Sequence, residues 1–388
     1  MVRRAEGMTS RVLGTLDEIE AIADEWRALE TACPDPLNYF QSYDWCRNWV
    51  SQFGDTHQPY VITVWRGGRL VALWPRMIVD MAGIRRLETL GAPHSQYCGI
   101  LMRRDGASEA GIVKALRQAG RASNCDVTIS RAVPKGSALD KLLSDKPVIA
   151  GSDNVASVLD LSGFASSEAY TAQLGKLQRR NRNRRRNHLA RLGDLTFEVI
   201  WPGHADFDTL VYQCTEMKQR WLHETGRFSV GFSMSGYADF LAGLSGDPGA
   251  ASGACLSVLR AGDKVVALEL GLLRRGHYYA YIGGFDWDLK DLSPGKVQMD
   301  MTVGWLIDNG VQTYDLLINP AEYKSSWTNS EIAVSGRAEP LSWRGRFYVS
   351  AWLPRLRPAI KRLHDRWPAF VDRATMFLRP AACLLLYV

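Results

Sequence analysis

The residues best suited to binding an anion lie in the stretch 278–327, whose pattern predicts strand, turn, helix and strand. The helix is predicted to open at Ser293, Pro294, Gly295 and Lys296. Ser suits an N-cap, Pro suits the first helical position, and Gly lets a ligand approach the backbone closely. The N–H groups of a first helical turn attract phosphate, and Lys296 adds a positive charge. The segment therefore predicts an anion site at a helix end, with an ordinary helix start as the alternative.

Three acidic residues in and near this stretch are candidates for a general base. Glu269 interrupts the apolar run VVALELGLL, where a buried carboxylate is costly unless it is paired or functional. Asp286 follows the predicted strand 278–283, and Asp315 lies on the next predicted strand, 313–318. Each has a structural alternative: strand alternation turns Glu269 to solvent, Asp286 shapes a turn, or Asp315 pairs with a cation. Water as the proton acceptor also stays open.

The composition predicts a globular protein of two domains in a reducing cytoplasm. A chain of 388 residues exceeds what one hydrophobic core usually serves, and 46% of its residues are hydrophobic against 23% charged. Seven Cys without C-x-x-C spacing argue against a disulfide framework and against a zinc site. Neither a Walker loop nor an H-E-x-x-H or Ser-His-Asp pattern is present. We therefore expect no metal.

The ends of the chain carry basic residues without a membrane-spanning pattern. Behind the N-terminal arginines there is no apolar segment of a signal peptide, and no apolar run approaches the ~20 residues of a membrane span. The stretch 344–363 is basic and amphipathic but interrupted by Pro354 and Pro358. We expect it to pack on the body as a helix, with a peripheral role at the inner membrane as the alternative.

Most of the formal net charge of +6 is concentrated in the run QRRNRNRRRNHLARL. A face carrying Arg179 and Arg182 could bind an anionic acceptor, a nucleotide-sugar diphosphate or a coenzyme A phosphate. Nucleic acid and a merely solvated face are the alternatives. Trp221, His223 and Arg227, in RWLHETGRF, are candidates to line an acceptor pocket, although Trp221 could equally belong to the core.

The elements that must position these residues follow one order twice. Each half of the chain predicts two helices followed by a hairpin, which is a repeat of architecture rather than of sequence. The predicted domains are 1–150 and 151–345, followed by an extension, 346–388. The first half is predicted as helices 16–30 and 38–53 with strands 60–65 and 70–78, and the second as helices 168–192 and 207–223 with strands 256–260 and 264–273.

The order FDWD, SPG, helix, NG, YDLL and YKSSW resembles the acyltransferase domain of the GNAT superfamily, in its CelD-like branch of cellulose or polysaccharide biosynthesis. That branch is related to the Fem-type aminoacyltransferases. The segment LNYFQSYDWCRNWV and the arginine-rich helix resemble it too. The resemblance implies an α/β fold of two tandem GNAT-like domains, each with a mixed, mostly antiparallel sheet flanked by helices, and an acyl-CoA donor. SPG stands where GNAT enzymes usually carry the Q/R-x-x-G-x-G/A pyrophosphate loop.

The resemblance also implies roles for residues 323 and 324. In Fem-type enzymes a lysine that follows an aromatic residue is thought to stabilise the developing oxyanion, and Tyr323-Lys324 matches that pair. Tyr323 is alternatively the acid that protonates the leaving thiolate. The helix end 293–296 would hold the CoA pyrophosphate beside two parted strands. The simpler alternative is a packed Tyr and a solvated Lys.

We therefore expect a cytoplasmic, acyl-CoA-dependent N- or O-acyltransferase that acts on an amino sugar or related acceptor in envelope or exopolysaccharide synthesis. The second domain would hold the site, and the first would serve acceptor binding and architecture. Two other hypotheses stay open: a Fem-type transferase that uses aminoacyl-tRNA, and a non-catalytic accessory protein of a polysaccharide synthase.

Overall fold

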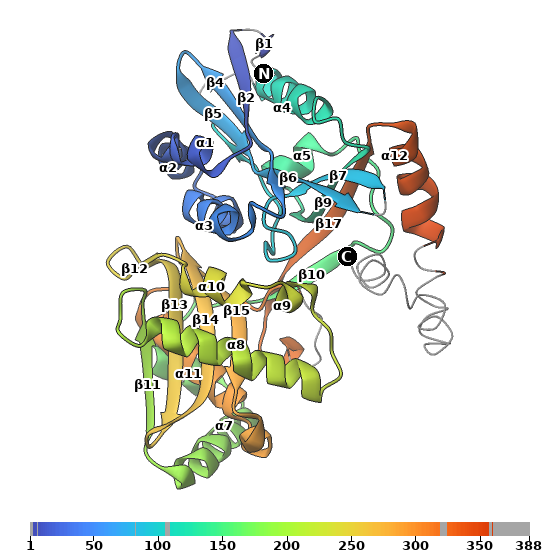
Figure 1. Ribbon diagram of the computed structural model, residues 1–388. Helices are drawn as coiled ribbons and strands as arrows, with labels where there is room; N and C mark the ends of the chain where they lie inside the picture. The colour runs from blue at the N-terminus through green and yellow to red at the C-terminus, as the bar shows by residue number, and fades with distance from the viewer. Residues whose placement is uncertain are drawn as a thin grey trace. The chain divides into compact units, whose positions relative to one another are not determined.

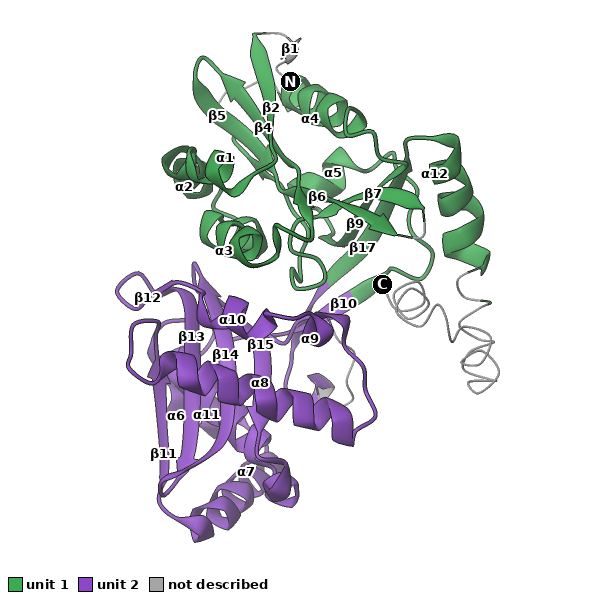
Figure 2. Cartoon of the chain, in the orientation of Figure 1, with its two compact units in different colours: residues 1–154, 333–388 green, residues 155–332 purple. Residues whose placement is uncertain are grey.

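The computed structural model describes residues 3–5, 7–81, 83–104, 109–318, 324–356 and 359. The chain forms two compact units, which Figures 1 and 2 show: unit 1 contains residues 1–154 and 333–388, and unit 2 contains residues 155–332. Residues 333–345, which the sequence analysis assigned to the second domain, lie in unit 1. The reason is that residues 334–340 pair with a strand of that unit.

Unit 1 contains two sheets and their covering helices. The first sheet has the order β1 (Arg3–Ala5), β2 (Met8–Leu13), β4 (Val61–Arg66), β5 (Arg69–Trp74), β8 (Leu101–Met102). The second has the order β17 (Ser330–Pro340), β9 (Val127–Pro134), β7 (Ile84–Thr89), β6 (Arg76–Met81), β3 (Gln58–Pro59). The helices are α1 (Leu16–Glu20), α2 (Ala23–Ala32), α3 (Tyr43–Phe53), α4 (Glu109–Arg121), α5 (Ala138–Leu142) and α12 (Trp343–Phe347), with a 3₁₀ turn, η1 (Pro36–Gln41), and a π-helix, η5 (Tyr348–Leu356).

Three elements predicted as continuous in unit 1 are divided in the structure. The helix predicted over 16–30 becomes α1 and α2, and α1 is opened by a capping box between Thr15 and Glu18. The helix predicted over 38–53 begins as a 3₁₀ turn, and α3 starts only after Ser42, whose side chain accepts the N–H of Trp45. The strand predicted over 70–78 divides at Pro75, which has no N–H for a ladder.

Unit 2 is built on one sheet, with the order β11 (Leu195–Ile200), β13 (Ser252–Ala261), β14 (Lys264–Arg274), β15 (His277–Phe285), β16 (Thr313–Asp315), β10 (Asn154–Asp160). A short strand, β12 (Gly246–Asp247), pairs with β13. The pairing is antiparallel except between β15 and β16. The helices are α6 (Ser167–Gln173), α7 (Lys176–Leu189), α8 (Phe207–Glu224), α9 (Val230–Ser233), α10 (Tyr237–Ala242) and α11 (Pro294–Asp308), with 3₁₀ turns η2 (Ala190–Leu192), η3 (Trp287–Leu292) and η4 (Lys324–Ser326).

The two faces of the unit 2 sheet are covered by different helices (Figure 1). Helix α8 lies against one face so closely that a Cβ added to Gly284 of β15 would be 2.7 Å from the carbonyl oxygen of Cys214. Helix α11 covers the other face, where Gln298 Nε2 donates to Ser257 Oγ of β13 at 2.6 Å. Since α6 and α7 contact α11 in turn, α11 is buried on most sides.

The predicted elements of unit 2 are mostly confirmed. Strand β11 has the predicted bounds, and α8 extends the predicted helix by one residue. The helix predicted over 168–192 is interrupted at Leu174 and Gly175, which separate α6 from α7. Strand β16 ends at Asp315, three residues before the predicted end. This early end matters because it opens the sheet at the candidate site.

Candidate active site

Strands β15 and β16 run in parallel for only three residue pairs and then part. His277, Tyr278 and Tyr279 pair with residues 313–315, after which β16 ends. Leu317 then takes a left-handed conformation, with φ of 62°, which a residue with a side chain rarely adopts. Strand β15 continues to Phe285, paired among the described residues with β14 alone. Among the described residues, residues 282–285 of β15 therefore have no second strand neighbour and form an open edge.

Two features of β15 shape this open edge. The register with β14 shifts after Leu270, so that Tyr281 is an extra, bulged residue. Two residues further on, Gly283 is exposed, and a Cβ added there would meet no atom within 4 Å. A central strand normally has neighbours at such a position. The space next to Gly283 is therefore open where a side chain would begin.

Lys324 lies where the two strands part. Its side chain is only 4% exposed, and Nζ donates to the carbonyl oxygens of Leu316 at 2.7 Å and Leu317 at 3.1 Å. Burial lowers the pKa of Lys324 to about 8, the carboxylate of Asp315 opposes this, and the charge of Lys218 adds to it. The alternative of a solvated Lys324 is therefore wrong. Tyr323 lies outside the described residues.

Asp315 joins the two sides of the opening. Its fully buried carboxylate hydrogen-bonds His277 Nε2 of β15 at 3.0 Å through one oxygen. The other oxygen accepts the N–H of Leu317 at 2.7 Å. The carbonyl oxygen of Leu317 also accepts a hydrogen bond from Lys324 Nζ. Asp315 therefore fixes the turn that anchors the lysine. This geometry supports the structural alternative for Asp315 over a role as general base.

Glu269 is buried on the α11 side of the sheet. Its oxygens accept the hydroxyls of Tyr278 and Tyr314, each at 3.0 Å. Burial raises the pKa of Glu269 to about 7, although both hydroxyl bonds oppose the shift. The alternative that turns Glu269 to solvent is therefore wrong. Glu269 and Gly283 are direct partners across β14 and β15, so the carboxyl lies on the same face as the open space.

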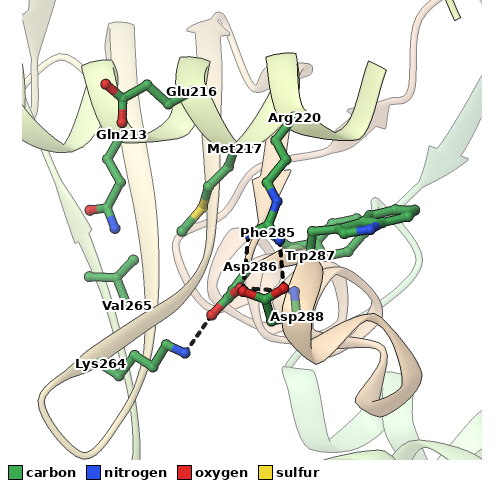
Figure 3. A pocket seen from close by; sticks show the side chains of 10 residues that line it. All are labelled: Gln213, Glu216, Met217, Arg220, Lys264, Val265, Phe285, Asp286, Trp287 and Asp288. Atoms are coloured by element: carbon green, nitrogen blue, oxygen red, sulfur yellow. Dashed lines mark hydrogen bonds and ion pairs between the residues drawn. The ribbon is translucent and has the colours of Figure 1, made fainter. Parts of the chain in front are cut away.

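Asp286 shapes the end of β15, as the structural alternative proposed. It accepts the N–H of Asp288 at 3.0 Å and pairs with Lys264 at 2.5 Å. It also lines a cleft of about 400 Å³ between α8 and the end of β15 (Figure 3). Arg220 crosses this cleft to Asp288 in a bidentate pair with distances of 2.5 and 3.1 Å. The ion pairs leave Asp286 poorly placed to act as a base.

The beginning of α11 differs in detail from the prediction. Ser293 has φ of 58°, and its side chain makes no capping hydrogen bond, so it is not a side-chain N-cap. Its carbonyl instead accepts the N–H groups of Lys296 at 3.0 Å and Val297 at 3.3 Å. Pro294 has no N–H, which makes Gly295 the amide of this turn best placed for a ligand. Gly295 is half-buried, and a Cβ added there would lie 3.4 Å from the ring of Phe285.

The candidate substrate-binding arginines of α7 differ in their surroundings. Arg182 pairs with Asp300 at 2.5 Å, donates to the Tyr170 hydroxyl at 3.0 Å and lies 4.4 Å from the Trp327 ring centroid. It therefore attaches α7 to α11 rather than extending toward a ligand, because its charge is already paired. Arg179, by contrast, is exposed.

The structure also places the residues of RWLHETGRF. Trp221 is half-buried, with Lys218 Nζ 3.9 Å and Arg227 Cζ 4.9 Å from its ring centroid. His223 and Arg227 are exposed at the end of α8. The sequence analysis missed Lys218, although its position three residues before Trp221 on one helix face was a usable signal. It also missed His277, because only the strand register brings this residue to Asp315.

The described residues include no group of three or more His, Cys, Asp or Glu side chains placed to hold a metal ion.

Comparison with known families identifies the class of this site. Residues 176–325 match the family described as acetyltransferase (GNAT) domain, and this segment contains the parted strands, α11 and Lys324. Residues 176–325, most of unit 2, are thus similar to a GNAT-type acetyltransferase domain, and this match supports an acyltransferase. The predicted fold, with largely antiparallel sheets flanked by helices, is confirmed.

Two solved structures extend the similarity of fold over most of the chain. FemX superposes with a TM-score of 0.59 and 10% identity, covering 84% of this chain and 97% of that chain. The C-terminal domain of a protein named as a lysylphosphatidylglycerol synthetase from Agrobacterium fabrum superposes with a TM-score of 0.52 and 13% identity, covering 86% and 98%. At these identities the likeness shows the fold alone. No curated protein matches the sequence.

Replacing Asp315 by Ala is expected to destabilise unit 2. The change leaves the buried His277 Nε2 and the Leu317 N–H without their acceptor, and each such loss costs about 1–3 kcal/mol. Urea unfolding followed by tryptophan fluorescence measures the free energy of unfolding. Asp315→Asn, which keeps an oxygen at this position, should lower the free energy of unfolding by less than Asp315→Ala. Equal stability of wild type and Asp315→Ala would contradict the assigned role.

Glu269 should make the stability depend on pH in a defined direction. Its pKa is about 7 in the folded protein against an ordinary value of 4.5, so the folded state holds a proton that the unfolded state has lost. The pH-dependent contribution of Glu269 to the free energy of unfolding is therefore complete below about pH 4.5. It is lost as pH rises through about 7, at up to about 1.4 kcal/mol per pH unit. Glu269→Gln should flatten this part of the curve between pH 5 and 7. An unchanged slope in the variant would show that Glu269 is already ionised.

Proposed function

We propose that the protein transfers an acyl group from acyl-CoA to an amine or hydroxyl of an acceptor, directly, within a ternary complex at the open edge of β15. One observation carries this proposal: a central strand has an open edge at Gly283, with a buried lysine anchored where its neighbour departs. No packing requirement explains such an opening, since a sheet interior is normally filled.

The donor arm is proposed to lie along β15 from residue 282 to residue 285. Four strand residues span about 10 Å, which suits part of an extended arm that contains amides, such as pantetheine. Such an arm can bond the edge as an added strand does. The phosphates would then reach the turn at Ser293 and Pro294, where Gly295 and Lys296 supply an amide and a charge.

Lys324 is proposed to stabilise the oxyanion. An ammonium group has three donors, and the carbonyls of Leu316 and Leu317 engage two of them. We assign the third to the thioester oxygen, which gains negative charge as the acceptor attacks. The C–S bond then breaks and the thiolate takes a proton, for which Tyr323 is the proposed acid. Glu269, whose pKa of about 7 suits proton transfer near neutrality, is the proposed base.

Unit 1 is proposed to serve acceptor binding and architecture rather than catalysis. It repeats the strand–helix–strand arrangement in β7, α4 and β9, where β7 and β9 also pair in parallel. At that pair, however, the fully buried Arg76 donates to the carbonyls of Leu87 and Ile129 and to Ser130 Oγ. Arg76 therefore bridges β7 and β9, whereas β15 is open in unit 2.

The acceptor is proposed to be an amino sugar or related compound of envelope or exopolysaccharide synthesis. The support is the resemblance of the FDWD, SPG and YKSSW motifs to the CelD-like branch. The reaction is proposed to take place in the cytoplasm, with association of the protein with the inner membrane as the alternative. No helix among the described residues is long and apolar enough to cross a membrane.

A second candidate is a Fem-type reaction with aminoacyl-tRNA as donor. The exposed arginines of α7 favour it, because Arg179, Arg180 and Arg184 have no ion pair to an acid among the described residues and could neutralise phosphates. The FemX fold is compatible with it. An accessory protein without activity is the third candidate.

The deciding experiment combines titration with kinetics. Isothermal titration of acetyl-CoA, longer acyl-CoAs and tRNA should give binding of an acyl-CoA and no specific binding of tRNA. Lys324→Met should lower turnover about 10²-fold or more while leaving the Kd for acyl-CoA unchanged, because the oxyanion forms only in the transition state. Lys141→Met, at an exposed position of α5, is the matched control. Full turnover in Lys324→Met would refute the assigned role, and tRNA binding alone would favour the second candidate.

Gly295→Val is expected to weaken donor binding selectively. A larger side chain at this position crowds both the Phe285 ring and the amide assigned to the phosphates. The Kd for acyl-CoA should rise about tenfold or more, a loss of about 1.4 kcal/mol, with turnover at saturation preserved. Gly304→Ala, later on the same helix, is the control and should change neither quantity. Turnover that falls without a change in Kd would contradict the donor site at this helix end.

A further inference from the structure

A cluster of positive groups lies at the α8 side of the opening. Lys218 of α8 stands 3.9 Å from the Trp221 ring centroid, and Arg227 stands 4.9 Å from the same centroid. Both cations are thus held by one aromatic side chain. Burial lowers the pKa of Lys324, and the charge of Lys218 lowers it further.

The chain provides little compensation for these charges among its described residues. Burial lowers the pKa of Lys218 to about 8, and the charge of Arg227 lowers it further. The opposing influence on Lys218 is the Cys214 thiol, whose own pKa burial raises to about 12, so it is uncharged at neutral pH. The carboxylate of Asp315 favours the charge of Lys324, while it also hydrogen-bonds His277 Nε2 and the N–H of Leu317.

Other cations nearby are treated differently. On the same helix, Arg220 makes a bidentate pair with Asp288. Lys264, the first residue of β14, pairs with Asp286, which directly follows β15. Lys218 is half-buried and Lys324 is buried, whereas Arg227 is exposed, so the loss of solvation falls on the two lysines and repulsion between like charges adds to it. A bound anion would remove this cost. The contrast singles out the three residues Lys218, Arg227 and Lys324, here called the cation cluster.

We propose that Lys218 and Arg227 of the cation cluster bind an anionic group, a phosphate or carboxylate, carried by the acceptor. The inference rests on the proposed function and narrows its substrate class to an acidic acceptor, such as an amino sugar phosphate or an acidic amino sugar. With the acceptor bound through its anion to Lys218 and Arg227, its nucleophile lies beside Lys324 at the opening.

The anion belongs to the acceptor rather than to the donor because the two sites face opposite sides of the sheet. Gly284 of β15 faces α8, where a Cβ would meet Cys214. Phe285, the next residue, faces Gly295 at the start of α11, where the donor phosphates are assigned. Successive strand residues point to opposite faces, so the cation cluster is separate from the donor phosphate site.

Labelling of Lys218 tests the proposal at the residue itself. Full-length protein is acetylated briefly with acetic anhydride at pH 7.5, and modification of Lys218 is quantified by mass spectrometry in phosphate or in chloride at equal ionic strength. A bound anion that raises the pKa of Lys218 by about one unit slows labelling about tenfold. Glucosamine 6-phosphate, which carries a phosphate, and muramic acid, which carries a carboxylate, should protect Lys218 from acetylation. Glucosamine, which carries neither group, should not.

Matched variants complete the test. Arg227→Gln should abolish protection, and Arg220→Gln, whose arginine is paired with Asp288, should leave it intact. Equal labelling in phosphate and chloride would overturn the proposal. Protection of Lys218 by CoA, lost in Gly295→Val, would also overturn it and assign the cation cluster to the donor. A failure of the proposed function is distinguishable from this outcome. The protein would then bind no acyl-CoA, whereas the labelling of Lys218 would be unaffected.

Discussion

The buried carboxylate of Asp315 holds together the part of unit 2 on which the site depends. One oxygen bonds His277 on β15, and the other accepts the N–H of Leu317, where the chain leaves the sheet with a positive φ. A conformation of this kind costs about 1–3 kcal/mol, so it persists only where surrounding bonds determine it. The same turn supplies both carbonyls that anchor Lys324. The position of the lysine and the opening of the sheet thus follow from one buried group.

The two units show opposite solutions to the same architecture. Each has a parallel strand pair connected through a helix, β7 and β9 in unit 1 and β15 and β16 in unit 2. In unit 1 the buried Arg76 spans the pair and satisfies carbonyls on both strands, which closes the space with a group whose burial lowers its pKa. In unit 2 a glycine faces open space instead. The repeated arrangement therefore differs between the two units in the groups that lie at its parallel strand pair.

The charged side chains of unit 2 differ in whether the chain itself supplies an oppositely charged partner. Asp300 pairs with Arg182 and Arg186, which fixes α7 against α11 and removes part of the basic run from ligand binding. Asp286 and Asp288 are likewise paired with cations at the end of β15. The cation cluster differs, since burial lowers the pKa of two of its members, Lys218 and Lys324, and so disfavours their charges. This difference is what makes it a candidate for recognition rather than for structure.

The sequence by itself determined the α/β class and most strands and helices of unit 2, and it marked Glu269 and Lys324 as candidates, because these depend on local periodicity, on an acid within an apolar run and on a motif. It could not determine that β16 ends at Asp315, that Ser293 is not a side-chain cap, or that Arg182 is already paired. Those outcomes depend on contacts between residues far apart in the chain. His277 meets Asp315 across 38 positions and Arg182 meets Asp300 across 118, so only tertiary packing decides which charges are satisfied and which are left to bind a ligand.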